Sequence, residues 1–245
     1  MKIAAIYDIH GNFRALEAVL QAIEKEKVDK VIVGGDIAWG PQPKQVVERL
    51  YAKKDEYHFV MGNSDREIYE QYKLPPQAIH TMAEEVNQWC IEQLSDEQLE
   101  WLGSFRFSHV EEDVLFVHGS PRSDVEAIRI DTPAKEIEKM ISNTKQSTIV
   151  CGHTHIQFKR MIASKNIINT GSVGLQSRSR GACWLCINSK EIELRMTEYD
   201  VERAAEELLQ ENAPYKEEFA AHVRTLHFRD HKKLSAYYYL DRITV

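Results

Sequence analysis

The sequence predicts an α/β protein built on a largely parallel sheet, and three observations support this fold class. Short apolar runs that are typical of buried strands alternate with a segment of helical periodicity in the first quarter of the chain. Two of these runs are followed by glycine and then a polar residue, as strands are where a loop begins. Hydrophobic residues make up 43% of the 245 residues, which is sufficient for a packed core.

The N-terminal segments supply this alternation. Residues 2–7 form the first strand run, and residues 28–33 and 57–61 form two more. Asn12 is placed to cap a helix that extends to about Lys25, whose apolar residues recur at helical spacing: Leu16, Val19, Leu20 and Ile23. A strand–helix–strand order of this kind predicts βαβ units, in which the strands are parallel.

The middle of the chain is expected to be helical first and then to return to strands. Residues 66–105 lack strand alternation, and Ser95 with Gln98 forms a capping box within them. Three further strand runs follow, at 114–117, 147–150 and 166–168. We therefore expect a helical insertion at about 66–105 in a single domain that spans residues 1–245.

The C-terminal part predicts a hairpin and then helices. Residues 182–187 and 192–196 are strand-like and flank a polar turn at 188–190. From Asp200 the pattern becomes helical, over 201–212 and 214–228. We expect a helical C-terminal extension at about 200–245.

Composition and charge exclude several classes of protein. The net charge of −7 argues against a nonspecific nucleic-acid binder, which would carry a basic surface. No run of about 18 apolar residues is present, so we expect no membrane span. The N-terminus lacks the features of a signal peptide, and the four cysteines are therefore expected to be reduced thiols in a cytoplasmic protein.

Polar residues that can bind metals follow five of the strand runs. They are Asp8 and His10, Asp36, Asn63, His118, and His153 with His155. In an open α/β sheet, ligands bind beyond the carboxyl ends of the strands, so these seven side chains should meet at one edge. Carboxylates and imidazoles suit Mn, Fe, Zn and similar ions. The sequence therefore predicts a metal site.

The same motifs, in this order, resemble those of the calcineurin-like metallophosphoesterases over about residues 2–197. The motifs are Asp8-Ile9-His10-Gly11, Gly34-Gly35-Asp36, Gly62-Asn63-Ser64-Asp65, His118-Gly119 and Gly152-His153-Thr154-His155. The segment Asn169-Thr170-Gly171-Ser172-Val173-Gly174 extends the resemblance toward small prokaryotic phosphodiesterases and phosphatases. The resemblance implies a four-layer α/β/β/α sandwich of two mixed sheets flanked by helices.

The resemblance also implies two divalent metal ions and the ligands of each. One set of ligands would be Asp8, His10 and His155; the other would be Asn63, His118 and His153; and Asp36 would bridge them. Two metals about 3.5–4 Å apart would activate a hydroxide and clamp the phosphate under attack. Manganese is the first expectation, and Fe, Zn, Co or Ni suit the same ligands.

One motif departs from the family pattern at the residue after Asn63. Many relatives have a histidine there that is thought to protonate the leaving group, whereas this chain has Ser64. Loss of a general acid typically costs about 10²–10⁴ in rate, and most for poor leaving groups. We therefore consider Asp65 or a water molecule as the proton donor, beside Asn63 as a second catalytic residue.

The expected substrate is a small phosphorylated molecule with a good leaving group. Phosphodiester or phosphoanhydride bonds meet this requirement, and dinucleoside polyphosphates are one such class. Two alternatives remain open at this point. One is a broad phosphomonoesterase or cyclic-nucleotide phosphodiesterase, and the other is a protein-interaction scaffold on the same fold that has lost catalysis.

Three residues are candidates for binding the substrate. Trp39 follows the expected bridging ligand, where its ring would stack on a base or pack a loop. Arg178 and Arg180 follow the Gly-Ser-Val-Gly segment and would reach substrate phosphates, unless they are solvated surface residues.

Other side chains are expected to be structural. Cys183 and Cys186 would point to opposite faces of one strand, which disfavours a redox pair. The six histidines outside the motifs are interpreted as structural or surface residues: His58, His80, His109, His222, His227 and His231. The aromatic tail around Tyr237 to Leu240 would either form a contact in a homo-oligomer or cover the core.

Overall fold

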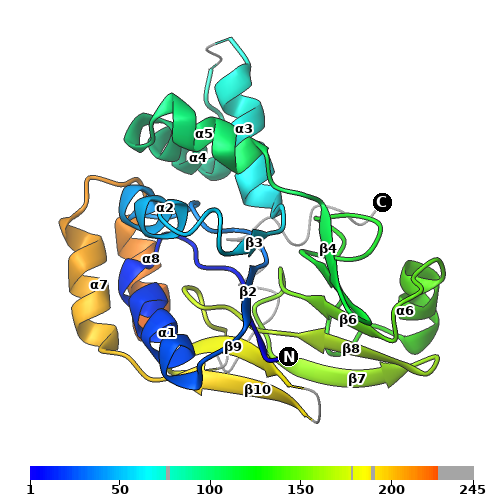
Figure 1. Ribbon diagram of the computed structural model, residues 1–245. Coiled ribbons are helices and arrows are strands. Elements are labelled where there is room, and N and C mark those ends of the chain that lie inside the picture. Colours follow the sequence, from blue (N-terminus) through cyan, green and yellow to red (C-terminus); the bar gives the residue numbers. More distant parts are fainter. Residues whose placement is uncertain (76–77, 178, 189–190, 226–245) are drawn as a thin grey trace.

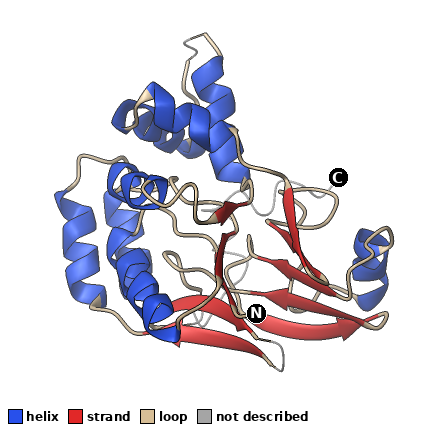
Figure 2. Cartoon of the chain, in the orientation of Figure 1, coloured by secondary structure: helices blue, strands red, loops and turns tan. Residues whose placement is uncertain are grey.

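The computed structural model describes residues 1–75, 78–177, 179–188 and 191–225. Two five-stranded sheets stack face to face, and helices cover their outer faces (Figure 1). Figure 2 shows the helices outside the sheets, most of them on the side of the first sheet. The expected four-layer arrangement is confirmed.

The first sheet has the strand order β10-β9-β1-β2-β3. Its parallel part contains β1 (Ile3–Ile6), β2 (Lys30–Val33) and the short β3 (His58–Phe59). The antiparallel pair β9 (Ala182–Ile187) and β10 (Ile192–Thr197) completes it, which confirms the hairpin. The sheet is therefore mixed, with its three N-terminal strands delivering their carboxyl ends to one edge.

The second sheet has the strand order β4-β5-β6-β8-β7. The parallel strands are β5 (Val114–Val117), β6 (Thr148–Cys151) and β8 (Lys165–Asn169). The antiparallel edge strands β4 (Ser108–Glu111) and β7 (Phe158–Ile162) were not expected from the sequence. Their alternating exposure, with Met161 largely exposed, weakens the apolar signal of an edge strand.

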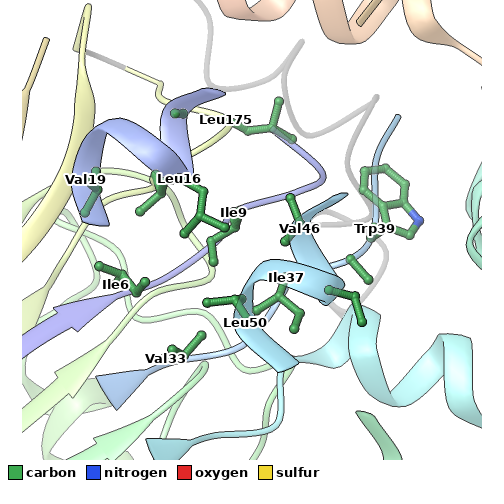
Figure 3. Close-up of a cluster of buried hydrophobic side chains, with 14 of the residues drawn as sticks. Ile6, Ile9, Leu16, Val19, Val33, Ile37, Trp39, Val46, Leu50 and Leu175 are labelled. Atoms are coloured by element: carbon green, nitrogen blue, oxygen red, sulfur yellow. The ribbon is translucent and has the colours of Figure 1, made fainter. Parts of the chain in front are cut away.

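Alternation of side chains along the strands divides the core into three clusters. The cluster between the sheets contains Ile3, Ala5, Tyr7, Ile32, Val60, Val114, Phe116, Val150, Ile168, Leu185 and Ile187. The opposite face of the first sheet packs on helices through Ala4, Ile6, Val33 and Trp184, and part of that cluster is drawn in Figure 3. Because the side-chain period of a strand is two, one sheet serves two cores.

Four helices cover the outer face of the first sheet. They are α1 (Phe13–Glu26), α2 (Pro43–Tyr51), α7 (Val201–Gln210) and α8 (Lys216–Arg224). Asn12 caps α1 as expected, since its side-chain oxygen accepts a hydrogen bond from the Ala15 N–H at 3.1 Å. On the second sheet, α6 (Ala134–Ile141) packs Ile137 and Ile141 against the strands.

Three further helices stand together at one end of the molecule, above α2 and β3 (Figure 1). They are α3 (Asn63–Lys73), α4 (Met82–Gln93) and α5 (Asp96–Gly103). The capping box of Ser95 and Gln98 is present at the start of α5. The segment is helical as the sequence indicates, although its first helix begins at Asn63, so a metal-ligand candidate lies in the first turn.

Two further expectations concern a membrane span and the aromatic tail. Among the described residues, no helix is long and apolar enough to cross a membrane. The aromatic tail from Tyr237 to Leu240 lies outside the described residues, so its proposed oligomer contact stays a prediction.

Candidate metal centre

The structure brings the seven predicted ligands together at the carboxyl ends of the strands. Asp8 and His10 follow β1, Asp36 follows β2, and Asn63 begins the helix after β3. From the second sheet, His118 follows β5, and His153 and His155 follow β6. Both sheets therefore contribute to a single buried cluster.

One group of ligands combines Asp8, His10 and His155. One ligand atom from each residue lies within 4.8 Å of the others. The Nε2 atoms of His10 and His155 are 3.2 Å apart, and Oδ1 of Asp8 is 3.5 Å from Nε2 of His155. Two ligands that each lie about 2.1 Å from a shared cation are separated by about this distance.

A second group combines Asp36, His118 and His153, again with ligand atoms within 4.8 Å. The amide oxygen of Asn63 lies 3.2 Å from Nε2 of His118, so this residue belongs beside the second group. Imidazole, carboxylate and amide oxygen together form a donor set for a divalent transition metal.

Asp36 lies between the two groups. Its Oδ2 is 3.6 Å from Nε2 of His10, in the first group, and 3.4 Å from Nε2 of His118, in the second. Its Oδ1 accepts a hydrogen bond from the Ser64 N–H at 2.9 Å. One carboxylate oxygen is thus held by the backbone while the other faces histidines of both groups.

Three of the histidines are oriented through their other ring nitrogen. Nδ1 of His10 lies 3.2 Å from the carbonyl oxygen of Trp39, and Nδ1 of His118 lies 2.9 Å from that of Gly34. His155 has the same relationship with Leu175, at 3.0 Å. Because a carbonyl only accepts, Nδ1 carries the proton and donates, which turns Nε2 toward the cluster as a ligand.

Asp8 has an oxygen whose surroundings fit a cation. Its Oδ2 accepts a hydrogen bond from the His153 N–H at 2.9 Å. Its Oδ1 is buried and has no hydrogen-bond partner among the described residues. A buried carboxylate oxygen without a partner is costly, and coordination of a metal ion would remove that cost. The residues present therefore fit a bound divalent metal.

Backbone conformation also marks this cluster. Five of the seven predicted ligands have positive φ: Asp8 at 56°, His10 at 47°, Asp36 at 54°, His153 at 65° and His155 at 57°. Residues other than glycine rarely adopt this left-handed backbone conformation, because their Cβ crowds the carbonyl oxygen. Strained residues of this kind persist where the surrounding structure holds them, and they concentrate at functional sites.

Burial and neighbouring charges set the protonation of the histidines. Burial lowers the pKa of both His10 and His153 to about 4, so each is a neutral imidazole at neutral pH, the form that binds metals. For His118 burial acts in the same direction, but Asp36 and Asp8 outweigh it and raise its pKa to about 10. A cation next to Asp36 would take the place of that proton.

Burial and neighbouring charges have the opposite effects on the pKa values of the carboxylates. Burial raises the pKa of Asp8 and Asp36, but the nearby histidines outweigh burial and hold the pKa of each below its usual value. Both groups are therefore anionic at neutral pH, which is the state that a metal ligand requires.

Asp65 is placed differently from a proton donor. Its Oδ2 accepts the N–H groups of Asp36 at 2.7 Å and Gly62 at 3.3 Å, and its Oδ1 accepts that of Ile37 at 3.0 Å. The residue is fully buried. Asp65 thus fastens the loop that carries Asp36 to the start of α3, which favours a positioning role over the catalytic role expected from the sequence.

The expected substrate-binding residues lie in three different settings. Trp39 is only 7% exposed and packs edge-on against His10 and Phe219, within the cluster of Figure 3. Arg180 is exposed and lines a cavity of about 240 Å³ beside α7 and α8. Arg178 lies outside the described residues. The packing of Trp39 favours the loop-packing alternative over base stacking.

Two residues next to the cluster have contacts that the sequence did not indicate, although Ser172 belongs to one of the quoted motifs. Glu67 lies one helical turn after Asn63 in α3, and burial together with Asp36 raises its pKa to about 7. The hydroxyl of Ser172 donates to the carbonyl oxygen of Asp8 at 2.7 Å and accepts from the Leu175 N–H at 2.7 Å. The i, i+4 spacing from Asn63 was the available signal for Glu67.

Comparison with known proteins agrees with this geometry. A sequence profile described as the calcineurin-like phosphoesterase superfamily domain matches residues 1–191. The chain belongs to the calcineurin-like phosphoesterase superfamily. All seven candidate ligands lie within the matched residues.

Three proteins that are similar to this chain match most of its length. An uncharacterized protein of Methanocaldococcus jannaschii is 25% identical over 243 residues, which cover 86% of this chain and 93% of that protein. A metallophosphoesterase from Sphaerobacter thermophilus has a structure with a TM-score of 0.74 and 24% identity, covering 91% and 98% of the two chains. The structure of a hypothetical protein from Pyrococcus horikoshii OT3 has a TM-score of 0.77 and 21% identity, covering 90% of this chain and 96% of that chain. At these identities the structural likeness concerns the fold.

Proposed function

We propose that this calcineurin-like phosphoesterase hydrolyses phosphodiester or phosphoanhydride bonds at a centre that holds two divalent metal ions. The observation that carries the proposal is the position of Asp36, whose Oδ2 faces His10 and His118 from the two ligand groups. A single carboxylate oxygen between two sets of ligands is suited to bridging two cations.

The ligands divide into two sets around that bridge. Asp8, His10 and His155 would hold one ion, and Asn63, His118 and His153 would hold the other. When bound, such a pair supplies an activated water nucleophile and neutralises the charge of the phosphate under attack. Manganese is our first choice of metal, and Fe, Zn, Co or Ni have the same ligand preferences.

The protein contributes orientation through its backbone. The carbonyl oxygens of Trp39, Gly34 and Leu175 each fix the tautomer of one histidine ligand. Conserving that orientation matters because outer hydrogen bonds of this type change metal affinity or activity by about 10–100-fold.

Ser64 narrows the expected substrate. The residue is 5% exposed, and its hydroxyl has no hydrogen-bond partner among the described residues. A serine hydroxyl has no pKa suited to protonating a departing alkoxide, so the reaction should depend on the stability of the leaving group. A phosphoanhydride meets this condition because its leaving group is a phosphate anion. We therefore favour small nucleotide-like anhydrides, with dinucleoside polyphosphates as the class to test first.

A leaving-group series on manganese-loaded enzyme tests this proposal. We expect turnover to fall steeply from nitrophenyl to phenyl to alkyl phosphodiesters, and Ser64→His to raise the rate for the alkyl ester most. A rate that barely changes across the series would contradict a missing proton donor. Failure to hydrolyse any phosphate compound with full metal occupancy would favour the scaffold alternative.

Product analysis separates the remaining enzymatic alternatives. Dinucleoside polyphosphates, cyclic nucleotides and simple phosphomonoesters are offered at equal concentration, and kcat/KM is compared. The proposal requires the highest value for the anhydride. A preference for the monoester or the cyclic nucleotide would show that leaving-group stability does not determine specificity.

A further inference from the structure

A further group of side chains that are able to ligate a metal lies outside the cluster described above. His58 of β3 and His109 and Glu111 of β4 each place a ligand atom within 4.8 Å of the others. The rings of His58 and His109 are stacked, with centroids 4.3 Å apart and planes inclined by 19°. Nε2 of His109 lies 3.5 Å from Oε2 of Glu111. The group shares no residue with the two catalytic sets.

Strand register explains why these three side chains meet. Each is paired, directly across a ladder, with a residue of the core between the sheets: Ile32, Phe116 and Val114. Directly opposed residues of paired strands share a face, so the three side chains face the space between the sheets. β3 and β4 are edge strands of the two different sheets. At this edge, His58, His109 and Glu111 therefore occupy positions where the core between the sheets has apolar residues.

The cluster is offset from the catalytic centre along the strands. Glu111 lies opposite Val114, which is the first residue of β5, whereas the catalytic ligand His118 follows the last residue of that strand. A metal bound to this group would therefore lie beside β5 between Val114 and Phe116, whereas the phosphate site lies beyond the carboxyl end of that strand.

The donor atoms suit a zinc-type ion. Nε2 of His109 is buried and has no hydrogen-bond partner within the described part of the chain. Burial, together with His58, lowers the pKa of His109 and so keeps its imidazole in the neutral form. Two imidazoles and one carboxylate are a common protein contribution to zinc, with water as the remaining ligand.

Lys30 would compete with a metal ion for the carboxylate of Glu111. Its ammonium group lies 2.5 Å from Oε2 of Glu111, so the carboxylate already has a cationic partner. All of these side chains keep partial solvent access, which gives a metal ion an entry path. A divalent ion bound to both histidines would share Glu111 with Lys30 or displace the ammonium group.

We propose that His58, His109 and Glu111 form a third, structural metal site that binds a zinc-type ion and joins the edges of the two sheets. The ion would link β3 to β4 beside two existing contacts. These are the Lys30–Glu111 ion pair and the isolated bridge between Val60, just after β3, and Arg106, just before β4. Binding to the folded state alone stabilises the fold by mass action. This site is independent of the proposed hydrolytic reaction.

Zinc titration of the full-length, metal-free protein tests the proposal. Calorimetry, followed by elemental analysis after desalting, compares the wild type with His109→Gln and Glu111→Gln. The control is His80→Gln, which removes an exposed histidine ahead of α4. Circular dichroism and turnover of the manganese-loaded variants verify that each variant is folded.

We expect His109→Gln and Glu111→Gln each to bind one zinc equivalent less than the wild type and the His80→Gln control. Zinc should also raise the thermal unfolding midpoint less in these variants, because one stabilising ion is missing. Equal zinc content in all four proteins would overturn the proposal. The difference of one equivalent does not depend on whether the catalytic cluster binds two ions, so the two proposals fail separately.

Discussion

Oδ1 of Asp8 lies 3.5 Å from Nε2 of His155, a residue far along the chain, and this oxygen has no hydrogen-bond partner among the described residues. Asp8 follows β1 of the first sheet and His155 follows β6 of the second sheet, so their approach depends on the stacking of the two sheets. An unpartnered carboxylate oxygen facing an oriented imidazole is an arrangement that a cation completes.

Replacement of Asp36 by asparagine should disable the centre more than the loss of any hydrogen bond around it. The change removes the negative charge between His10 and His118 while it keeps size and shape. We expect turnover to fall by at least about 100-fold, since even outer-shell changes cost up to this amount. Metal content and kcat of the loaded variant check this. Activity within a few-fold of the wild type would mean that Asp36 does not bridge.

Asp65 should prove to be a positioning residue. Asp65→Ala leaves three buried N–H groups without their acceptor, and we expect a loss of at least about 2 kcal/mol in the free energy of unfolding. Urea denaturation measures this loss, with Ser64→Ala as a neighbouring control that removes an unpartnered hydroxyl and should change stability by less than about 1 kcal/mol. If Asp65→Asn instead keeps full stability but removes one limb of the pH–rate profile, Asp65 is the proton donor.

Gly174 should be essential for the geometry of the first ligand group. A Cβ at this position would lie 1.7 Å from the carbonyl oxygen of Ile9, which is backbone and cannot give way easily. Gly174→Ala should therefore shift the loop whose Leu175 carbonyl orients His155, and it should weaken metal binding. Gly103→Ala is the matched control, because its Cβ meets the side chain of Tyr69 away from the metal cluster. Equal metal affinity in both variants would contradict this reading of the loop.

The four cysteines should be unreactive in the folded protein. Burial raises the pKa of Cys90 to about 12, and it also raises the pKa of Cys151, Cys183 and Cys186. A raised pKa lowers the thiolate fraction, and the thiolate is the species that reacts. A disulfide reagent at about pH 8 should modify the thiols of the native protein slowly. After unfolding, the same reagent should modify all four thiols rapidly. Rapid modification of one thiol in the native state would identify a site that opens.

The gathering of the candidate ligands at one edge could be predicted because strand ends are visible in the sequence. Val31 to Val33 and Ile149 to Cys151 are short apolar runs, and a parallel sheet delivers whatever follows such runs to one edge. The left-handed backbone of Asp36 and His153 could not be predicted in this way. Nothing in a local sequence marks a non-glycine residue that the surrounding fold holds at positive φ.

Other parts escaped prediction because their local signals are weak. Strand β3 covers only His58 and Phe59, although an apolar run extends to Met61, because Val60 makes an isolated bridge to Arg106, which precedes β4. The cluster around His58 and His109 depends on the stacking of the sheets. Two histidines about fifty positions apart on separate edge strands become neighbours only when both sheets are in place.

Electron paramagnetic resonance of the manganese-loaded protein tests the central claim most directly. Two Mn²⁺ ions that share the Asp36 carboxylate should give the spectrum of an exchange-coupled pair at two ions per chain, and Asp36→Asn should abolish the coupling. A six-line spectrum of isolated ions in the wild type at full occupancy would contradict the bridged two-metal centre.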